Sequence, residues 1–391
     1  MKTYRDVFAV GEFRTLFAGS TAGVAGGTMA MLALSTLVYA HTGSPFLAAM
    51  AYLAGFLPQA LGSLVLGGLA DRLPTRPLLA GWELVRACVL VTFASGTLPV
   101  WAMLALVMAV GLFESVSMAA RMALVTDLLP GNGYVLGRSV LNIAVGAMQI
   151  GGFAGGGLLL TLIGPGAALW GAAALAVVVS LVYRLGLRAR SPRTTERRSI
   201  RGARELLGDR RLRGLLLVQW VPNGLIVGAE ALYVPFAGQS AGVLFVAAAG
   251  GMLVGDAVVG RWTTPESRLR LAVPLYVLLA VPYLAFAAGP GIWVAAGLVA
   301  VASFGFSGSL GNQERYVAAL PEEMRGQGLG LAGSGMQTGQ ALAASLTGTV
   351  AEAVPVHVTM ALAAVASLVA TACLVRHLRP VSRPGALPAS R

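Results

Sequence analysis

The apolar run over residues 214–237 contains four side chains that could bind a solute or a proton. Gln219, Asn223, Glu230 and Tyr233 occur at i, i+4, i+11 and i+14. At 100° per residue, this spacing places them on one face of a single helix. A carboxyl group that is removed from water is more easily protonated, so we expect Glu230 to be a proton carrier or a counter-charge for a cation. The alternative is a Glu bonded to a neighbouring helix.

Polar and aromatic side chains in other apolar runs are further candidates. We add Glu114 and Glu314 as transport or coupling groups, and Ser303, Ser307 and Phe113 as groups that could line a substrate cavity. Glu114 has Arg121 seven residues later, so a structural ion pair is the alternative to coupling. Glu83 and Arg86 are three residues apart, a spacing that favours a local salt bridge on a helix.

The sequence lacks the usual signs of a metal, cofactor or nucleotide site. It has 2 Cys and 3 His, too few for a disulfide scaffold, and a Cys/His metal centre is not expected. No G-x-x-x-x-G-K-[ST] motif is present, so we expect no ATP hydrolysis. A lipid-modifying enzyme would need clustered catalytic groups, whereas His41, His357 and His377 are scattered.

The composition indicates a membrane protein. Of the 391 residues, 57% are hydrophobic and 11% are charged, whereas soluble proteins are about 25% charged. The formal net charge is +12, but a nucleic-acid-binding protein would place such charge on a far more polar surface, so no nucleic-acid partner is expected. Apolar runs of about 20 residues predict transmembrane helices. We count twelve, at roughly 16–40, 46–70, 77–97, 100–120, 136–162, 166–186, 214–237, 240–260, 270–289, 291–313, 327–350 and 355–376.

The basic residues predict an orientation. If the N-terminus is cytoplasmic and the runs alternate, the outward joints contain no Lys or Arg; they lie near 41–45, 97–99, 163–166, 237–240, 288–291 and 351–356. Eleven Arg lie between Arg184 and Arg213. Because cytoplasmic joints are enriched in Lys and Arg, we predict a multi-pass cell (inner) membrane protein with both termini cytoplasmic. Its basic segments would face anionic lipid.

The basic segment also divides the chain into two sets of six runs. Residues 148–151 read MQIG and residues 336–339 read MQTG, an offset of 188 that indicates an internal repeat. We expect an N-terminal six-helix half at 1–186, a cytoplasmic basic linker at 187–213, a C-terminal six-helix half at 214–378 and a cytoplasmic tail at 379–391. Repeated halves imply a binding site at their interface near the bilayer midplane.

Residues 67–76, after the second run, read GGLADRLPTR. This joint resembles the G-x-x-x-D-R-x-G-R-R signature of the major facilitator superfamily, with Pro74 in place of the usual Gly and Thr75 in place of an Arg. The resemblance implies an all-α integral membrane fold, with twelve transmembrane helices in two six-helix halves. It also implies a cytoplasmic gating cluster, whose candidates are Gly67, Asp71, Arg72, Arg76 and Asp127.

Residues 151–157 read GGFAGGG and resemble the antiporter motif of that family, G-P-x-x-G-G. We expect Gly151 and Gly155, with Gly156, to form a smooth stripe for close helix packing; the alternative is generic glycine packing. The arginine motif of the family's fourth helix is missing, since Val107 and Gly111 occupy its expected positions. The resemblance further implies that the helix at 214–237 lines the central cavity.

These observations predict a secondary active transporter that is similar to the branch of the family that exports drugs, macrolides and siderophores. We expect proton-coupled efflux of amphipathic drugs or secondary metabolites by alternating access, because the predicted cavity is poor in charge. A monomer without enzymatic activity is expected. The alternatives are an importer or facilitator of a small metabolite, a lipid-modifying enzyme, and a receptor or structural membrane protein.

Overall fold

The computed structural model describes residues 4–53, 58–59, 62, 66, 69–129, 132–191, 200–321 and 324–378, and this part of the chain is helical without strands. Its α-helices are α1 Tyr4–Ala9, α2 Gly11–Thr42, α3 Pro45–Leu53, α5 Leu69–Arg72, α6 Thr75–Ala94, α7 Val100–Leu128, α8 Asn132–Gly186, α9 Ile200–Gly208, α10 Arg210–Glu230, α11 Tyr233–Ala237, α12 Ala241–Trp262, α13 Pro265–Ala280, α14 Ile292–Phe304, α15 Gly308–Ala319, α16 Arg325–Ala353 and α17 Val356–Leu374. Short 3-10 segments follow several of them: η1 Gly238–Ser240, η2 Val281–Ala288, η3 Gly305–Ser307 and η5 Val375–Leu378.

Within the described residues, nine helical segments are long and apolar enough to cross a membrane. The other three predicted spans correspond to the first limb of α8, to α16, and to 46–70, which is described only in part by α3, α5 and single residues between them. The predicted all-α membrane fold is thus confirmed. α10 begins at Arg210, inside the segment predicted as linker, because the Asp209 carboxylate accepts hydrogen bonds from the backbone N–H groups of Arg211 and Leu212, at 2.7 and 2.9 Å.

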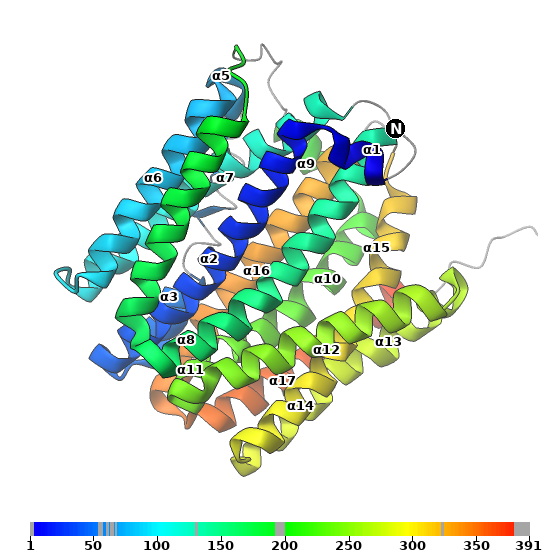
Figure 1. Cartoon of the computed structure of the whole chain (residues 1–391). Coiled ribbons are helices and arrows are strands. Elements are labelled where there is room, and N and C mark those ends of the chain that lie inside the picture. The colour runs from blue at the N-terminus through cyan, green and yellow to red at the C-terminus, as the bar shows by residue number, and fades with distance from the viewer. Residues whose placement is uncertain are drawn as a thin grey trace, which may run out of the picture.

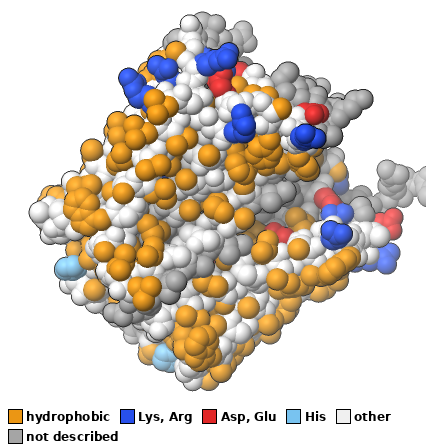
Figure 2. Space-filling view, in the orientation of Figure 1, with side chains coloured by type: hydrophobic (Ala, Val, Ile, Leu, Met, Phe, Trp, Pro, Cys, Tyr) orange, Lys and Arg blue, Asp and Glu red, His pale blue; other side chains and the backbone are white. Residues whose placement is uncertain are grey.

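The joints at one end of the bundle are tight turns. The described glycines with positive φ are Gly43, Gly96, Gly164, Gly238 and Gly289, and each lies in or beside a joint that contains no Lys or Arg. Gly164 (φ 76°) interrupts α8 before Pro165 and turns the chain back without a loop; a side chain there would be strained. Lys and Arg side chains gather instead at the other end, near α5, α9 and α15 (Figure 2). We name this the arginine-rich end.

The helices pack as two groups. α2, α6, α7 and α8 contact one another and form the N-terminal group together with α3, while α10 to α17 form the C-terminal group. In Figure 1 the blue-to-green helices lie beside the green-to-orange ones. The main contacts between the groups join α3 to α16 and α8 to α12. In the described part of the chain, the seam between the groups is therefore built mainly from these two helix pairs.

The hydrophobic core shows where the two groups meet. One large cluster combines residues of both groups, such as Leu32, Ala49, Tyr233 and Phe245. Nearer the arginine-rich end, the core is divided into a cluster of N-terminal residues around Phe13 and Leu124 and a separate cluster of C-terminal residues around Leu216 and Tyr316. The described core residues thus pack the groups together at the end opposite the arginines, which we name the closed end, and form separate clusters at the arginine-rich end.

Glycines of α8 permit close contacts with α2 at Gly152 and at Gly156, one of the three glycines of the predicted stripe. A β-carbon on Gly152 would lie 2.8 Å from the carbonyl oxygen of Ala25, and one on Gly156 would lie 3.1 Å from the Cα of Met29. A β-carbon on Gly151 or Gly155 would meet nothing within 4 Å. The prediction for Gly151 and Gly155 is therefore wrong by one residue, because the face of α8 that packs against α2 is the next one along the helix.

Candidate functional site

Side-chain amides cluster where the two groups of helices meet. Gln337 of α16 donates a hydrogen bond to Gln59 of the N-terminal group at 3.4 Å, and Gln340 donates to the Asn223 side chain of α10 at 3.0 Å. The Gln219 amide lies 4.0 Å from the sulfur of Met336. We name these five residues the amide row: Gln59, Gln219, Asn223, Gln337 and Gln340.

The amide row offers neutral hydrogen-bond donors and acceptors beside polarizable sulfur. The Gln59 amide also lies 3.7 Å from the Met118 sulfur. Amides and thioethers suit solutes with carbonyl or hydroxyl groups on a flexible apolar body. The sequence analysis identified Gln219 and Asn223 but missed Gln59, Gln337 and Gln340. The repeated M-Q-x-G segment contains Gln337 and could have revealed it.

Glu230, the last residue of α10, lies at the edge of a group of tyrosines. Its side chain is half-buried, and the described residues provide it with neither a hydrogen bond nor an ion pair. Tyr52, Tyr233 and Tyr283 lie close enough to interact with it electrostatically. Glu230 is thus a carboxyl group at membrane depth that is not committed to a structural ion pair in the described part of the chain.

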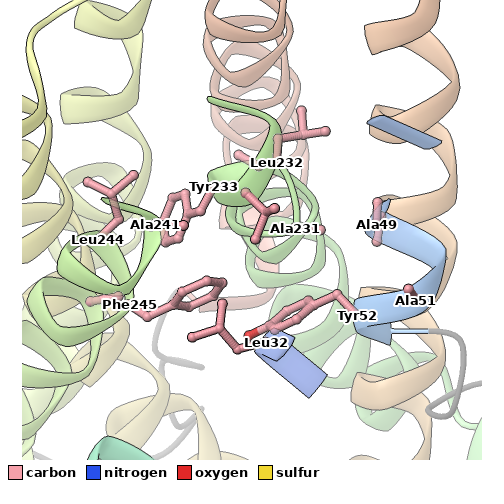
Figure 3. Close-up of a cluster of buried hydrophobic side chains, with 14 of the residues drawn as sticks. Leu32, Ala49, Ala51, Tyr52, Ala231, Leu232, Tyr233, Ala241, Leu244 and Phe245 are labelled. Atoms are coloured by element: carbon pink, nitrogen blue, oxygen red, sulfur yellow. The ribbon is translucent and has the colours of Figure 1, made fainter. Parts of the chain in front are cut away.

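Aromatic side chains from both groups stack beside Glu230 and close the seam. Tyr52 of α3 packs on Phe245 of α12 with ring centroids 5.3 Å apart, and Tyr233 packs on Phe245 at 5.0 Å (Figure 3). The hydroxyl groups of Tyr233 and Tyr283 are hydrogen-bonded at 2.5 Å. We name Tyr52, Tyr233, Phe245 and Tyr283 the aromatic seal.

Several predicted cavity residues are instead buried in helix packing. Tyr233 is 0% exposed within the aromatic seal, Ser303 is 2% exposed and Ser307 is 0% exposed. The Ser307 hydroxyl is hydrogen-bonded to the carbonyl oxygen of Phe304, within its own turn. In this conformation Tyr233, Ser303 and Ser307 are packed against neighbouring side chains and backbone, and their role in lining a cavity stays a prediction. Phe113 is 47% exposed on α7 and packs beside Trp82, so its role stays a prediction.

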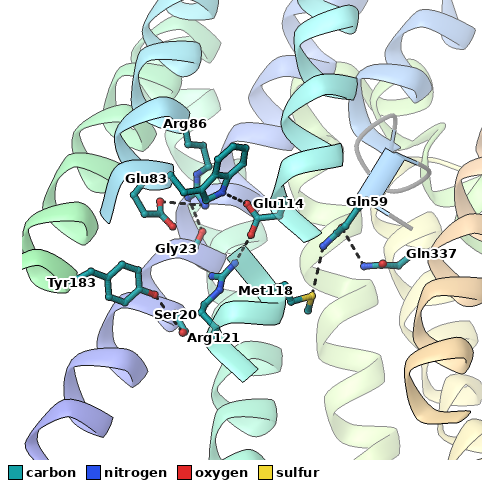
Figure 4. A network of polar contacts seen from close by, with 11 residues as sticks. Ser20, Gly23, Gln59, Glu83, Arg86, Glu114, Met118, Arg121, Tyr183 and Gln337 are labelled. Atoms are coloured by element: carbon teal, nitrogen blue, oxygen red, sulfur yellow. Dashed lines mark hydrogen bonds and ion pairs between the residues drawn. The ribbon is translucent and has the colours of Figure 1, made fainter. Parts of the chain in front are cut away.

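A network of charged side chains crosses the N-terminal group (Figure 4). Glu114 forms an ion pair with Arg121, and its other oxygen accepts a hydrogen bond from the Trp82 indole at 2.6 Å. Glu83 lies 3.4 Å from Arg86, which also donates to the carbonyl oxygen of Gly23 at 3.0 Å. The local Glu83–Arg86 salt bridge is confirmed. The ion pair of Glu114 agrees with the structural alternative for this residue, and its role in coupling stays a prediction.

Glu314 is also part of an ion pair. Its carboxylate lies 2.9 Å from the Arg268 guanidinium, and this pair joins α15 to α13 near the arginine-rich end. The Glu314 side chain is 38% exposed. An ion pair between neighbouring helices of one group is a structural explanation for Glu314, and its role in coupling stays a prediction.

The predicted gating cluster is only partly described. Gly67 and the side chain of Asp71 lie outside the described residues. α5 contacts α7, whose last turn contains the exposed Asp127, while Arg72 is exposed and Arg76 is half-buried. The backbone therefore brings the signature joint next to the helix that carries Asp127, and the cluster itself stays a prediction.

Among the described residues, no group of three or more His, Cys, Asp and Glu side chains lies close enough together to hold a metal ion.

The chain matches known transporters over most of its length. Residues 16–313 match the family model described as Major Facilitator Superfamily. The multidrug efflux pump Tap of Mycolicibacterium fortuitum is 27% identical over 372 residues, which cover 88% of this chain and 90% of Tap.

Solved structures show the same fold at low identity. The nucleoside transporter NupG is similar with a TM-score of 0.73 and 14% identity, over 94% of this chain and 100% of that one. A bacterial homologue of the human lysosomal transporter Spinster is similar with a TM-score of 0.68 and 16% identity, over 96% and 97% of the two chains.

Proposed function

The chain belongs to the Major Facilitator Superfamily and is a multi-pass membrane transporter; from this premise we propose that it exports amphipathic, weakly charged compounds in exchange for protons. In this proposal, the two groups of helices rock against each other and expose a central site to each side of the cell membrane in turn. The arginine-rich end and both termini face the cytoplasm, where the basic segments contact anionic lipid.

The amide row is the observation that carries the proposal about the substrate. It lies where the two groups meet, as expected for a site between repeated halves. Two arginines of the N-terminal group, Arg86 of α6 and Arg121 of α7, are already paired with carboxylates. A multiply charged anion would need free basic groups at the site, so neutral or weakly charged solutes fit better. Similarity to the multidrug efflux pump Tap supports efflux of such compounds.

Two structural features support alternating access. Among the described residues, the core is continuous at the closed end and divided at the arginine-rich end, as expected for a transporter that is open at its arginine-rich end. At the closed end, the seam consists mainly of the contacts between α3 and α16 and between α8 and α12. Such a seam can open without unfolding either group.

Glu230 supports the proposal of proton coupling. A carboxylate within a membrane span is costly unless it is paired or has a function, and the ion pairs of the described residues do not include it. It lies beside the aromatic seal, so a change in its charge alters the electrostatic energy of the contact at which the two groups separate. Protonation would allow the seal to close over a neutral group, and release of the proton would favour opening.

Transport by the purified protein in liposomes tests the proposal. With an imposed proton gradient, the wild type should move a lipophilic dye or macrolide against its concentration, and an uncoupler should stop this movement. Glu230→Gln should abolish gradient-driven transport while dye still binds. Glu266→Gln, at an exposed carboxylate in the first turn of α13, is the matched control.

Two outcomes would contradict the proposal. Wild-type gradient-driven transport by Glu230→Gln would remove Glu230 from coupling. Uptake of a small polar metabolite that equilibrates without a gradient, with no transport of any amphipathic compound, would favour a facilitator.

A further inference from the structure

We propose that Glu352 is a gate residue that holds the closed end shut by capping a helix of the opposite group, and that each transport cycle must break this contact. The proposal rests on the proposed alternating-access function. It concerns a contact at the surface of the seam, away from the amide row and from Glu230.

Glu352 lies near the last turn of α16 and reaches the start of α3. Its Oε1 atom accepts a hydrogen bond from the backbone N–H of Phe46 at 3.1 Å and a second from the hydroxyl group of Ser44. Ser44 in turn accepts hydrogen bonds from the N–H groups of Leu47, through its hydroxyl oxygen at 3.1 Å, and Ala48, through its carbonyl oxygen at 3.1 Å. The carboxylate therefore belongs to one group while the helix end that it caps belongs to the other.

The first turn of α3 needs this carboxylate. The N–H groups at a helix start require acceptors from outside the helix ladder, and α3 has two such groups after Pro45, which has no N–H group. The N–H group of Leu47 is satisfied by the Ser44 hydroxyl within the same group. The N–H group of Phe46 takes its acceptor from the C-terminal group. When the groups separate, this N–H group and the Ser44 hydroxyl lose their shared partner.

The contact is strong enough to bias the seam and weak enough to be reversible. A negative charge at a helix N-terminus is favourable because it opposes the positive end of the helix dipole, and hydrogen bonds to a carboxylate are stronger than neutral ones. The Glu352 side chain is exposed, so water replaces the lost bonds when the end opens. The ion pairs of Arg86, Arg121 and Arg268 each join residues of a single group, whereas the Glu352 carboxylate bonds across the seam.

Beneath Glu352, α16 packs closely on α3, so exposure of a residue between these helices shows that the closed end has opened. A β-carbon on Gly348 would lie 2.9 Å from the Cα of Phe46 and 3.3 Å from the Cβ of Ala49. The hydroxyl group of Ser345 lies 3.2 Å from the sulfur of Met50. Ala49 is 0% exposed, and it becomes accessible only if α3 and α16 separate.

Thiol labelling of the purified full-length protein in detergent tests the gate. In a background of Cys88→Ser and Cys373→Ser, which removes both native thiols, Ala49→Cys reports opening at the closed end. Gly333→Cys, on the α16 face one turn before Gln337 and in open space, reports closure at the arginine-rich end. The probe is a water-soluble maleimide, and labelling rates are compared for the wild type, Glu352→Ala, Glu352→Gln, Ser44→Ala and the control Glu266→Gln.

We expect Glu352→Ala to speed labelling at position 49 by about tenfold, the effect of two hydrogen bonds to a carboxylate on a two-state equilibrium, and to slow labelling at position 333. Glu352→Gln should have a smaller effect, and Ser44→Ala should add little to Glu352→Ala because both remove the same contact. Wild-type rates at both positions in Glu352→Ala would overturn the proposal. If that variant does not fold, wild-type rates in Glu352→Gln and Ser44→Ala would overturn it equally. Labelling does not depend on substrate or protons, so its result is separate from the test of efflux.

Discussion

Gly157 and Gly242 bring the backbones of the two groups into contact: a β-carbon on Gly157 would lie 2.6 Å from the Cα of Gly242. This crossing joins α8 to α12 near the closed end, and the α3–α16 pair is the other main contact between the groups. Small residues permit such close approach of helices in a membrane. The seam therefore depends on two glycines that belong to different groups.

The first prediction concerns this crossing. Gly157→Ala should force α8 and α12 apart and speed labelling of Ala49→Cys, because the added methyl group has no space. Gly155→Ala is the matched control, since a β-carbon there meets nothing within 4 Å. Equal labelling rates in the two variants would show that the seam tolerates the methyl group.

The second prediction separates two glutamines of α16. Gln337→Ala removes a bond across the seam and should raise the KM for exported compounds several-fold while the protein stays as stable as the wild type. Gln340→Ala leaves the Asn223 side chain, 5% exposed, without its donor and should lower stability by about 1–2 kcal/mol. Transport kinetics and the apparent melting temperature of each variant distinguish the two roles. A KM change in Gln340→Ala alone would contradict the assignment of Gln337.

The third prediction concerns the charged network of the N-terminal group. Glu114→Gln leaves Arg121, 11% exposed, without its counter-charge and should destabilise the protein by about 3 kcal/mol. The double variant Glu114→Gln/Arg121→Met should recover most of that loss. The melting temperature in detergent is the measurement. The control is Glu314→Gln, at a more exposed ion pair, which should change stability by less than about 1 kcal/mol. Equal losses of stability in Glu114→Gln and Glu314→Gln would show that burial of the Glu114–Arg121 pair does not raise the cost of breaking it.

The fourth prediction concerns the signature joint. Asp71→Asn should slow transport without weakening substrate binding, because Asp71 is proposed to act in the cytoplasmic gating cluster and away from the central site. Initial transport rates and dye-binding affinity measure the two effects, and Glu266→Gln again serves as control. Unchanged turnover would remove Asp71 from the gating cluster.

The arrangement of spans could be predicted because it depends on local properties of the chain. Apolar length and basic joints locate helices whatever their neighbours are, and the turn at Gly164 coincides with the predicted joint at 163–166. Pairs such as Glu83 and Arg86 depend on spacing within one helix, so they were predictable too. The bond between Trp82 and Glu114 joins different helices, α6 and α7, and spacing along one helix contains no information about it.

The site was less predictable because one assumption about helix α10 was wrong. The rule of 100° per residue relates Glu230 to Tyr233 only if the helix continues, but α10 ends at Glu230 and α11 begins at Tyr233. Because of this break, Tyr233 lies in the core between the groups, and Glu230 lies at the edge of that core. Gln59 and Gln337 meet from opposite groups, so their proximity depends on the relative position of the groups, which apolar periodicity does not determine.

The Gly157–Gly242 crossing divides the first limb of α8 into a long part toward the arginine-rich end and a short part toward the closed end. The helix can therefore act as a lever about this crossing. At 1.5 Å per residue, the limb extends about 37 Å from Gly157 to its start at Asn132 and about 10 Å from Gly157 to the break at Gly164. A rotation of about 10° around the crossing would move the arginine-rich tip by about 6 Å and the other tip by about 2 Å. A small displacement among the contacts of the closed end is therefore amplified about threefold at the far side of the membrane.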